Sequence, residues 1–466
     1  MNVFLLISDT FRYDNFFDRA AAGPMGMPVR TPNLDAFSER AVSLSKMYTS
    51  SFPTIPHRTD ITTGRFGWPW YPWQSRLKSS ENHLPQILHP AGYVSQLICD
   101  CPHLYRADFD DGFHAAIATR GQESDSYLLR MNHPIAHAMP PEKTRTGHHF
   151  QGRNLPDLAA WMNPNWGRED ECFPPRTAGL VVRWLEENYR CGKLFLWADF
   201  FDPHEPWNPP EYMVRRYQAD YDGDPMLHPN YGRASDYTSE ELVNLRAHYC
   251  AEAELVDRWV GRCLQKIDDL GLWDDSIVIF TADHGMSIGE HGRTGKSNIN
   301  DGDDRYWPIY PEIAQVPFLI AAPGLEGGRE VAGIVQPPDV LPTVLELAGL
   351  DVQTPEPLHG ESFAPMLRGE SDRPIREFAV SASFLRSTDE HKVRPEAVTP
   401  VVYTAEWAYV PVGADGAREL YRLSDDPYAT KDVAADHADV ADDMHAKLIA
   451  FLKDLDAPPE AAAVYE

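Results

Sequence analysis

Short apolar segments that stop at polar or turn-forming residues constrain the fold of this chain more than any other feature. Runs of this length and composition are typical of strands buried on both faces of a sheet. Helical patterns separate them along the chain, so the sequence predicts an α/β fold with a large, mostly parallel sheet sandwiched by helices. The runs are Val3–Ile7, Tyr93–Ile98, Leu194–Phe200, Ile277–Thr281 and Phe318–Ala321.

The longest predicted helix covers Thr238–Leu270, where Thr238 and Glu241 form a capping-box signature. Shorter helices are predicted over Pro175–Tyr189 and Asp339–Leu347, which lie between or after the apolar runs. The strands therefore alternate with helices over most of the chain.

The character of the sequence changes after about residue 369. Two aromatic segments with strand propensity, Phe378–Phe384 and Pro400–Val412, precede a helical pattern over Asp439–Leu455. We therefore predict a large α/β domain over residues 1–368 and a smaller C-terminal α+β domain over residues 369–466.

The charge balance excludes several classes of partner. The chain has 70 acidic and 42 basic residues, which gives a formal net charge of −28. Nucleic acids and anionic membranes require a basic surface, so neither is an expected partner. A small anionic substrate remains possible if it binds in a locally basic pocket.

The cysteines and the N-terminus bear on the cellular compartment. The 6 cysteines are scattered, which favours reduced thiols over a disulfide framework. The first apolar run has no basic segment before it, and no run approaches the roughly 18–20 residues that cross a bilayer. The cytoplasm is the simplest location, and a homo-oligomer stays open.

Polar side chains stand just beyond the predicted strands, where ligands bind in an open parallel sheet. Asp9 and the pair Asp283-His284, which Gly285 follows, could hold one divalent ion. Carboxylates with an imidazole suit Mn²⁺, Zn²⁺ or Ca²⁺. The alternative is that these residues only form turns. Other polar residues at such positions are His103, Asp202 and His204.

The segment from Thr54 to Arg65 predicts a loop followed by a helix. Free backbone N–H groups at that helix N-terminus, together with Arg58, could receive a tetrahedral oxyanion. A threonine hydroxyl is a poor nucleophile at its ordinary pKa, and a bound cation can lower that pKa. The alternative is a capped helix without a catalytic role. Lys296 could neutralise anionic oxygens or be a solvated loop charge, and His204 alone could be structural.

Together these motifs resemble the sulfatase family of the alkaline phosphatase superfamily. The opening strand with Asp9, the segment Thr31-Pro-Asn-Leu-Asp35 and Asp283-His284-Gly285 follow the family's order. The stretch Thr54-x-Pro-His-Arg58 stands where the family has Cys/Ser-x-Pro-Ser-Arg.

The resemblance implies one divalent ion held by Asp9, Asp283 and His284, with the nucleophile at Thr54, which also contacts the ion. It implies further that Arg58, His204 and Lys296 bind the anionic group of a small ester substrate. His103 or His204 would protonate the leaving oxygen.

Three positions depart from the family pattern. Thr54 cannot become formylglycine because its β-carbon carries a methyl group. Thr10 replaces a second Asp of many sulfatases, and Asp100 stands near a family Lys. The sequence therefore favours a hydrolase of phosphodiesters or phosphonate monoesters. The alternatives are a sulfate ester hydrolase with unmodified Thr54, a phosphoryl transferase and a non-catalytic relative.

Overall fold

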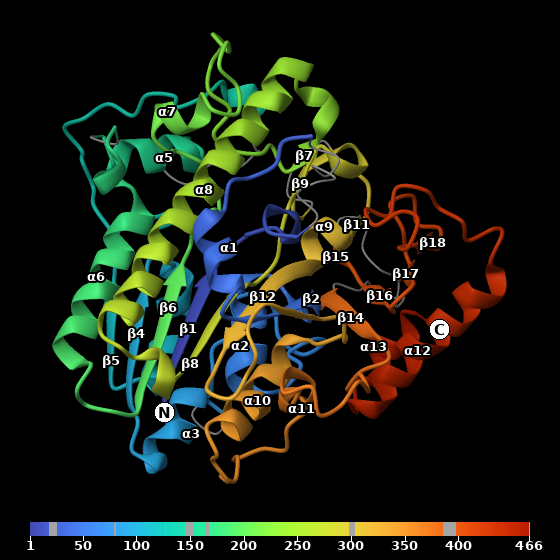
Figure 1. Cartoon of the computed structure of the whole chain (residues 1–466). Helices are drawn as coiled ribbons and strands as arrows, with labels where there is room; N and C mark the ends of the chain where they lie inside the picture. The colour runs from blue at the N-terminus through green and yellow to red at the C-terminus, as the bar shows by residue number, and fades with distance from the viewer. Residues whose placement is uncertain are drawn as a thin grey trace.

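The computed structural model describes residues 1–17, 26–78, 81–125, 127–144, 152–164, 167–297, 303–384 and 398–465. A sheet of 8 strands in the order β13-β2-β12-β8-β1-β6-β4-β5 runs through its centre (Figure 1). The strands are β1 (Asn2–Ser8), β2 (Val42–Tyr48), β4 (Val94–Cys99), β5 (Ala115–Ala118), β6 (Leu194–Phe200), β8 (Ser276–Ala282), β12 (Gln315–Ala321) and β13 (Arg329–Val331).

The predicted mostly parallel sheet is confirmed. Among the described pairings of this sheet, β12 runs antiparallel to β2 and β8, and the other pairs are parallel. Every residue of β1, β6 and β8 is buried, which explains why their sequences are continuous apolar runs. The sequence analysis missed β2, whose Val-Ser-Leu-Ser pattern alternates instead.

Helices flank the sheet, as predicted. Figure 1 shows α6 and α8 packed together over β4, β6 and β1, and α2 with α10 in a second group. The capping box at Thr238 is formed and starts α8. The helices are α1 (Pro32–Ser38), α2 (Thr54–Thr63), α3 (Leu84–Leu88), α4 (Pro102–Arg106), α5 (Leu155–Met162), α6 (Phe173–Asn188), α7 (Glu211–Val214), α8 (Ser239–Asp269), α9 (Pro311–Ala314), α10 (Val340–Leu347), α11 (Ala364–Leu367), α12 (Ala438–Asp454) and α13 (Pro459–Ala463).

A second sheet of 5 strands, in the order β18-β17-β16-β14-β3, lies toward the C-terminus and packs against α12 (Figure 1). Its members are β3 (Ser51–Phe52), β14 (Ala379–Ser383), β16 (Val401–Tyr403), β17 (Trp407–Val410) and β18 (Glu419–Arg422). A smaller C-terminal unit is thus present, and its boundary at residue 369 stays a prediction. β3 comes from the N-terminal part and pairs in parallel with β14. The C-terminal sheet therefore holds the segment that leads into Thr54.

Short strands complete the described fold. They are β7 (Gly232–Arg233), β9 (Ser287–Ile288), β10 (Arg293–Gly295), β11 (Trp307–Pro308), β13 at the edge of the central sheet, and β15 (Val398–Thr399). The 6 cysteines, all within the described residues, are free thiols, as expected. Within the described ranges, no helix has both the length and the apolar character needed to cross a membrane.

Candidate functional site

Two neighbouring parallel strands bring the predicted metal ligands together. β1 pairs with β8 so that Ser8 lies opposite Ala282, and the next residues are Asp9 and Asp283. His284 follows directly. One ligand atom from each of these three buried side chains lies within 4.8 Å of the others. The carboxyl ends of two central strands therefore assemble the cluster that the sequence predicted.

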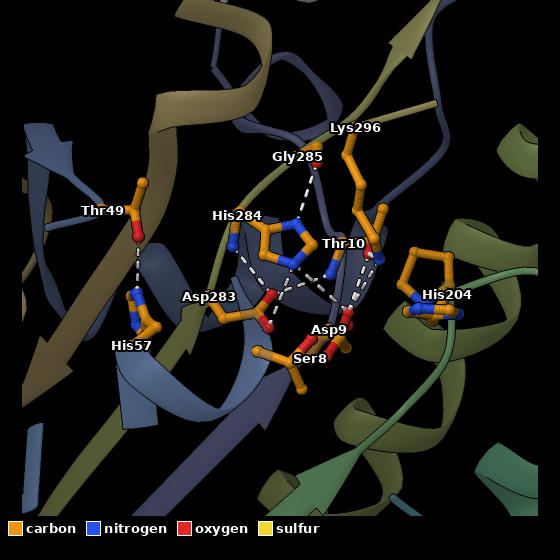
Figure 2. A network of polar contacts seen from close by, with 12 residues as sticks. Ser8, Asp9, Thr10, Thr49, His57, His204, Asp283, His284, Gly285 and Lys296 are labelled. Atoms are coloured by element: carbon orange, nitrogen blue, oxygen red, sulfur yellow. Dashed lines mark hydrogen bonds and ion pairs between the residues drawn. The ribbon is translucent and has the colours of Figure 1, made fainter. Parts of the chain in front are cut away.

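The orientation of His284 suits a metal ion. Its Nδ1 lies 2.9 Å from the carbonyl oxygen of Gly285, which places the ring proton on Nδ1. Nε2 then faces Asp283 Oδ2 at 3.5 Å and Asp9 Oδ1 at 3.8 Å (Figure 2). His284 Nε2 and Asp9 Oδ2 are buried and make no hydrogen bond. Two buried acceptor atoms without a hydrogen bond, of which Asp9 Oδ2 has only an ion pair with Arg58, fit a divalent cation with oxygen and nitrogen ligands.

The two carboxyl groups of this cluster titrate as a pair. Burial and the neighbouring charge of Asp283 raise the pKa of Asp9 well above its usual value. Burial would also raise the pKa of Asp283, but His284 and Arg58 hold it well below its usual range. Asp283 is therefore the carboxylate that carries the negative charge of the pair in the absence of an ion.

Thr10 orients both carboxylates. Its backbone N–H donates to Asp283 Oδ1 at 2.9 Å, and its hydroxyl donates to Asp9 Oδ1 at 2.7 Å. This geometry requires a φ of 61°, which is unusual for a β-branched residue. Lys296 Nζ in turn donates to Thr10 Oγ1 at 3.3 Å and lies 3.9 Å from Asp9 Oδ1 (Figure 2). The predicted basic residue Lys296 therefore lies at the cluster.

Arg58 is fully buried among carboxylates. Its Nε and Nη2 bind both oxygens of Asp199 at 2.8 Å. Its Nη1 donates to Asp283 Oδ2 at 2.6 Å and lies 3.3 Å from Asp9 Oδ2. Only the Nη1 edge of the guanidinium thus faces the metal cluster. Bidentate pairing with Asp199 fixes the plane of the group.

Thr54 begins α2 directly beside this cluster. Its side chain is buried, and its carbonyl oxygen accepts from Arg58 Nη1 at 3.0 Å, the atom that also binds Asp283. The helix is anchored by Asp60, whose carboxylate accepts from the backbone N–H groups of Ser51 at 3.0 Å and Gly67 at 2.7 Å. Arg58 therefore ties α2 to Asp283 just after β8, and Asp60 ties the helix to β3 and to Gly67 beyond its end.

The two predicted imidazoles both pack against one aromatic ring, that of Phe201. His204 stacks on Phe201 with ring centroids 4.1 Å apart, and His103 meets the same ring at 5.9 Å. Trp73 packs against His103 at 4.7 Å. Burial lowers the pKa of His204 well below its usual value, although Glu205 opposes this. In Figure 2 the His204 ring lies beside Lys296, so these groups could contact one substrate.

Comparison with known proteins shows to which family the chain belongs. A family model described as "Sulfatase" matches residues 1–350, and one described as "N-sulphoglucosamine sulphohydrolase, C-terminal" matches residues 302–454. The first match covers well over half of the chain. The chain belongs to the sulfatase family. It is accordingly an ester hydrolase, and this family generally binds a divalent metal ion.

Similar proteins carry sulfatase and phosphonate hydrolase names. An endo-4-O-sulfatase of Bacteroides thetaiotaomicron is 26% identical, covering 93% of this chain and 87% of that protein. Arylsulfatase K of Xenopus laevis is 24% identical, covering 100% and 84%. The crystal structure of a phosphonate monoester hydrolase from Agrobacterium radiobacter has a TM-score of 0.73 at 23% identity, covering 97% of this chain and 96% of that one. The structural match confirms the predicted alkaline phosphatase-like fold.

Within this sulfatase-family site, no described cysteine side chain is suited to replace Thr54 as a nucleophile. Cys101 is the thiol that interacts electrostatically with Arg58 and Asp9. It is buried, and burial raises its pKa well above the usual value. A thiol that stays protonated is a weak nucleophile. Thr54 thus remains the candidate at the family's nucleophile position.

The sequence analysis missed two functional neighbours of the sulfatase-family motifs. Asp199 lies inside the buried strand β6 and holds Arg58. An ionisable residue within an apolar run was a usable signal, because such residues are seldom buried unless paired. His57 follows Pro56 in α2, and burial lowers its pKa to about 3. Its Nδ1 lies 2.9 Å from Thr49 Oγ1.

A buried pair of carboxyl groups lies under the His204 loop. Asp202 and Glu252 share a hydrogen bond, and burial raises the pKa of Glu252 from 4.5 to about 8. In the native state the Glu252 carboxyl group therefore keeps its proton up to about pH 8. In the unfolded state the same group loses its proton above its ordinary pKa of 4.5. The free energy of unfolding should fall as the pH rises from about 5 to 8, by up to about 1.4 kcal/mol per pH unit for one proton.

Glu252→Gln should remove one such proton and make the decline between pH 5 and 8 shallower, while Asp202, whose pKa burial also raises, still contributes. Urea unfolding at several pH values measures the slope. Glu187→Gln, a change at an exposed helical carboxylate, is the matched control and should leave the slope unchanged. Parallel profiles for wild type and Glu252→Gln would show that Glu252 is ionised in the fold.

Proposed function

We propose that this sulfatase-family protein is a divalent-metal-dependent hydrolase of phosphate or phosphonate esters that acts through a covalent intermediate on Thr54. Phosphodiesters and phosphonate monoesters are the favoured substrates. The observation that carries this proposal is the position of Thr54. An unmodified threonine begins a helix in which Arg58 Nη1 donates to the backbone carbonyl oxygen of Thr54 and also contacts Asp283 and Asp9.

The chemistry of threonine favours phosphorus over sulfur. Formylglycine lets a sulfated intermediate collapse by breaking a carbon–oxygen bond, and the methyl group of Thr54 excludes that conversion. A phosphothreonine can instead be hydrolysed by water at phosphorus. The name of the phosphonate monoester hydrolase with the same fold agrees with this preference.

The roles of the residues follow from their contacts. A divalent ion held by Asp9, Asp283 and His284 would supply Lewis-acid polarisation and lower the pKa of the Thr54 hydroxyl. Arg58 Nη1 and Lys296 Nζ border the Asp9 side of the cluster and would neutralise the equatorial oxygens of the substrate.

The reaction forms and then hydrolyses a covalent intermediate on Thr54. Thr54 Oγ1 gives its proton to solvent, forms a bond to phosphorus and displaces the ester oxygen. His204 or His103 protonates the departing oxygen. His204 must first gain a proton at Nε2, because Nδ1 is bound to the carbonyl oxygen of Glu205 at 2.8 Å. A water molecule next cleaves the phosphorus–oxygen bond and restores the Thr54 hydroxyl.

A second candidate function is sulfate ester hydrolysis with unmodified Thr54. It is favoured by the names of two relatives, endo-4-O-sulfatase and arylsulfatase K, which align over most of the chain. A phosphoryl transferase would use the same intermediate but pass the group to an alcohol.

A panel of nitrophenyl substrates should separate these functions. The expected result is that kcat/KM for a phosphodiester or phosphonate monoester exceeds that for the sulfate by at least about 100-fold, a difference of about 2.7 kcal/mol. A sulfate preference would instead establish the second candidate. Product analysis with an added acceptor alcohol would show an alkyl phosphate if the protein is a transferase.

A further inference from the structure

A second group of metal-ligating side chains lies next to His204, apart from the cluster at Asp9. Glu123 follows β5, Glu205 follows β6, and His228 lies between α7 and α8. All three are buried, and one ligand atom from each lies within 4.8 Å of the others. Three segments far apart in the sequence thus bring two carboxylates and an imidazole to one point.

The geometry repeats that of His284. The Nδ1 atom of His228 lies 2.7 Å from the carbonyl oxygen of the next residue, Pro229, which places the ring proton on Nδ1. Nε2 then faces Glu123 Oε2 at 3.8 Å and Glu205 Oε1 at 3.9 Å. These distances exceed those of hydrogen bonds. Two ligand atoms at about 2.0–2.2 Å from one tetrahedral ion are about 3.3–3.6 Å apart, so a shift of a few tenths of an ångström would let these atoms share an ion.

Glu205 gives an independent indication of a ligand. Its Oε1 accepts from the Tyr231 hydroxyl, but its Oε2 is buried and has no hydrogen-bond partner. His204 Nδ1 lies 3.4 Å from Oε2 but donates to the Glu205 carbonyl oxygen, and Lys296 acts on this carboxylate through its charge, with no hydrogen bond to Oε2. An ionised carboxylate oxygen without a donor is costly to bury unless a cation binds it.

We propose that Glu123, Glu205 and His228 bind a second divalent cation, which fixes the loop that carries His204. Two carboxylates and one neutral imidazole favour Zn²⁺ or Mn²⁺. The site is separate from the first cluster. His204 lies at the second cluster, where its Nδ1 contacts Glu123 and Glu205. Lys296, which lies beside His204, contacts Asp9 of the first cluster (Figure 2).

Metal stoichiometry of the full-length protein tests this proposal without relying on activity. Chelator-stripped protein is loaded separately with Zn²⁺ and Mn²⁺, desalted and analysed by mass spectrometry of the metal content. Wild type should retain about two ions per chain with at least one of these metals, and His228→Gln about one. Glu123→Gln is a second variant in case His228→Gln does not fold, and circular dichroism checks the fold of each.

The neighbouring buried carboxyl Glu252 supplies the matched control, because Glu252→Gln removes a carboxyl group outside the cluster. That variant should still retain about two ions. A double variant of Asp283→Asn and His228→Gln should retain none. Retention of about one ion by wild type with both metals, or an unchanged count in His228→Gln and Glu123→Gln, would overturn the proposal.

Discussion

Replacing Thr54 with alanine should lower kcat for the preferred phosphoester by at least about 10⁴-fold, as removal of a catalytic nucleophile does elsewhere. The physical reason is that the alanine variant keeps Arg58, Lys296 and the metal cluster but has no atom that can form the covalent intermediate. Among the described residues, the ion pairs that hold the cluster do not involve the Thr54 side chain, so metal content should not change. Steady-state kinetics and metal analysis on the same preparations measure both effects.

Thr54→Ser is the matched control for this prediction, because it keeps a hydroxyl in the first turn of α2. It should retain activity within about 100-fold of wild type when produced in cells that lack formylglycine conversion. Near-normal turnover of Thr54→Ala with phosphodiester, phosphonate and sulfate substrates would show that another group is the nucleophile.

Asp283→Asn should cause the second large loss, both of bound ion and of activity. The change removes the negative charge that His284 and Arg58 hold, and Arg58 Nη1 would then face Asp9 as the remaining carboxylate at the cluster. We expect kcat/KM to fall by at least about 10³-fold, since a Lewis-acid ion contributes several kcal/mol. Chelation of the wild type should give a similar loss that added Mn²⁺ or Zn²⁺ reverses.

Asp303→Asn serves as a control, because Asp303 pairs with Arg305 and does not belong to the Asp9 cluster. It should keep both the ion and the activity. Full activity of the wild type after exhaustive chelation would contradict a metal-dependent mechanism.

The central fold could be predicted from the sequence because its strands are buried on both faces. β1, β6 and β8 are apolar over most of their length and are buried throughout. β2 was not predicted because its burial depends on the neighbouring strands β12 and β13, which the local sequence does not reveal. The pairing of β3 with β14 was also hidden, since two residues carry too little pattern to specify a strand.

The grouping of the candidate metal ligands Asp9, Asp283 and His284 could be predicted because they follow two recognisable strands, and parallel neighbours bring such ends together. The surroundings could not. The conformation of Thr10, and the bidentate bond between Arg58 and Asp199, depend on tertiary packing across distant segments. Several expectations stay predictions. They are the catalytic roles of His103, His204 and Lys296, a cytoplasmic location, and the absence of nucleic-acid and membrane partners.

Trapping the intermediate would show directly whether Thr54 becomes covalently modified during turnover. The wild type would be mixed with an excess of a nitrophenyl phosphonate or phosphodiester, quenched in acid within the first turnover, digested and analysed by tandem mass spectrometry. We expect one modified site in the wild type, with the phosphorus-containing group of the substrate on the peptide that contains Thr54. The Thr54→Ala variant should carry no such modification. Modification of another residue, or rapid turnover in which water attacks the substrate directly and labels no residue, would contradict it.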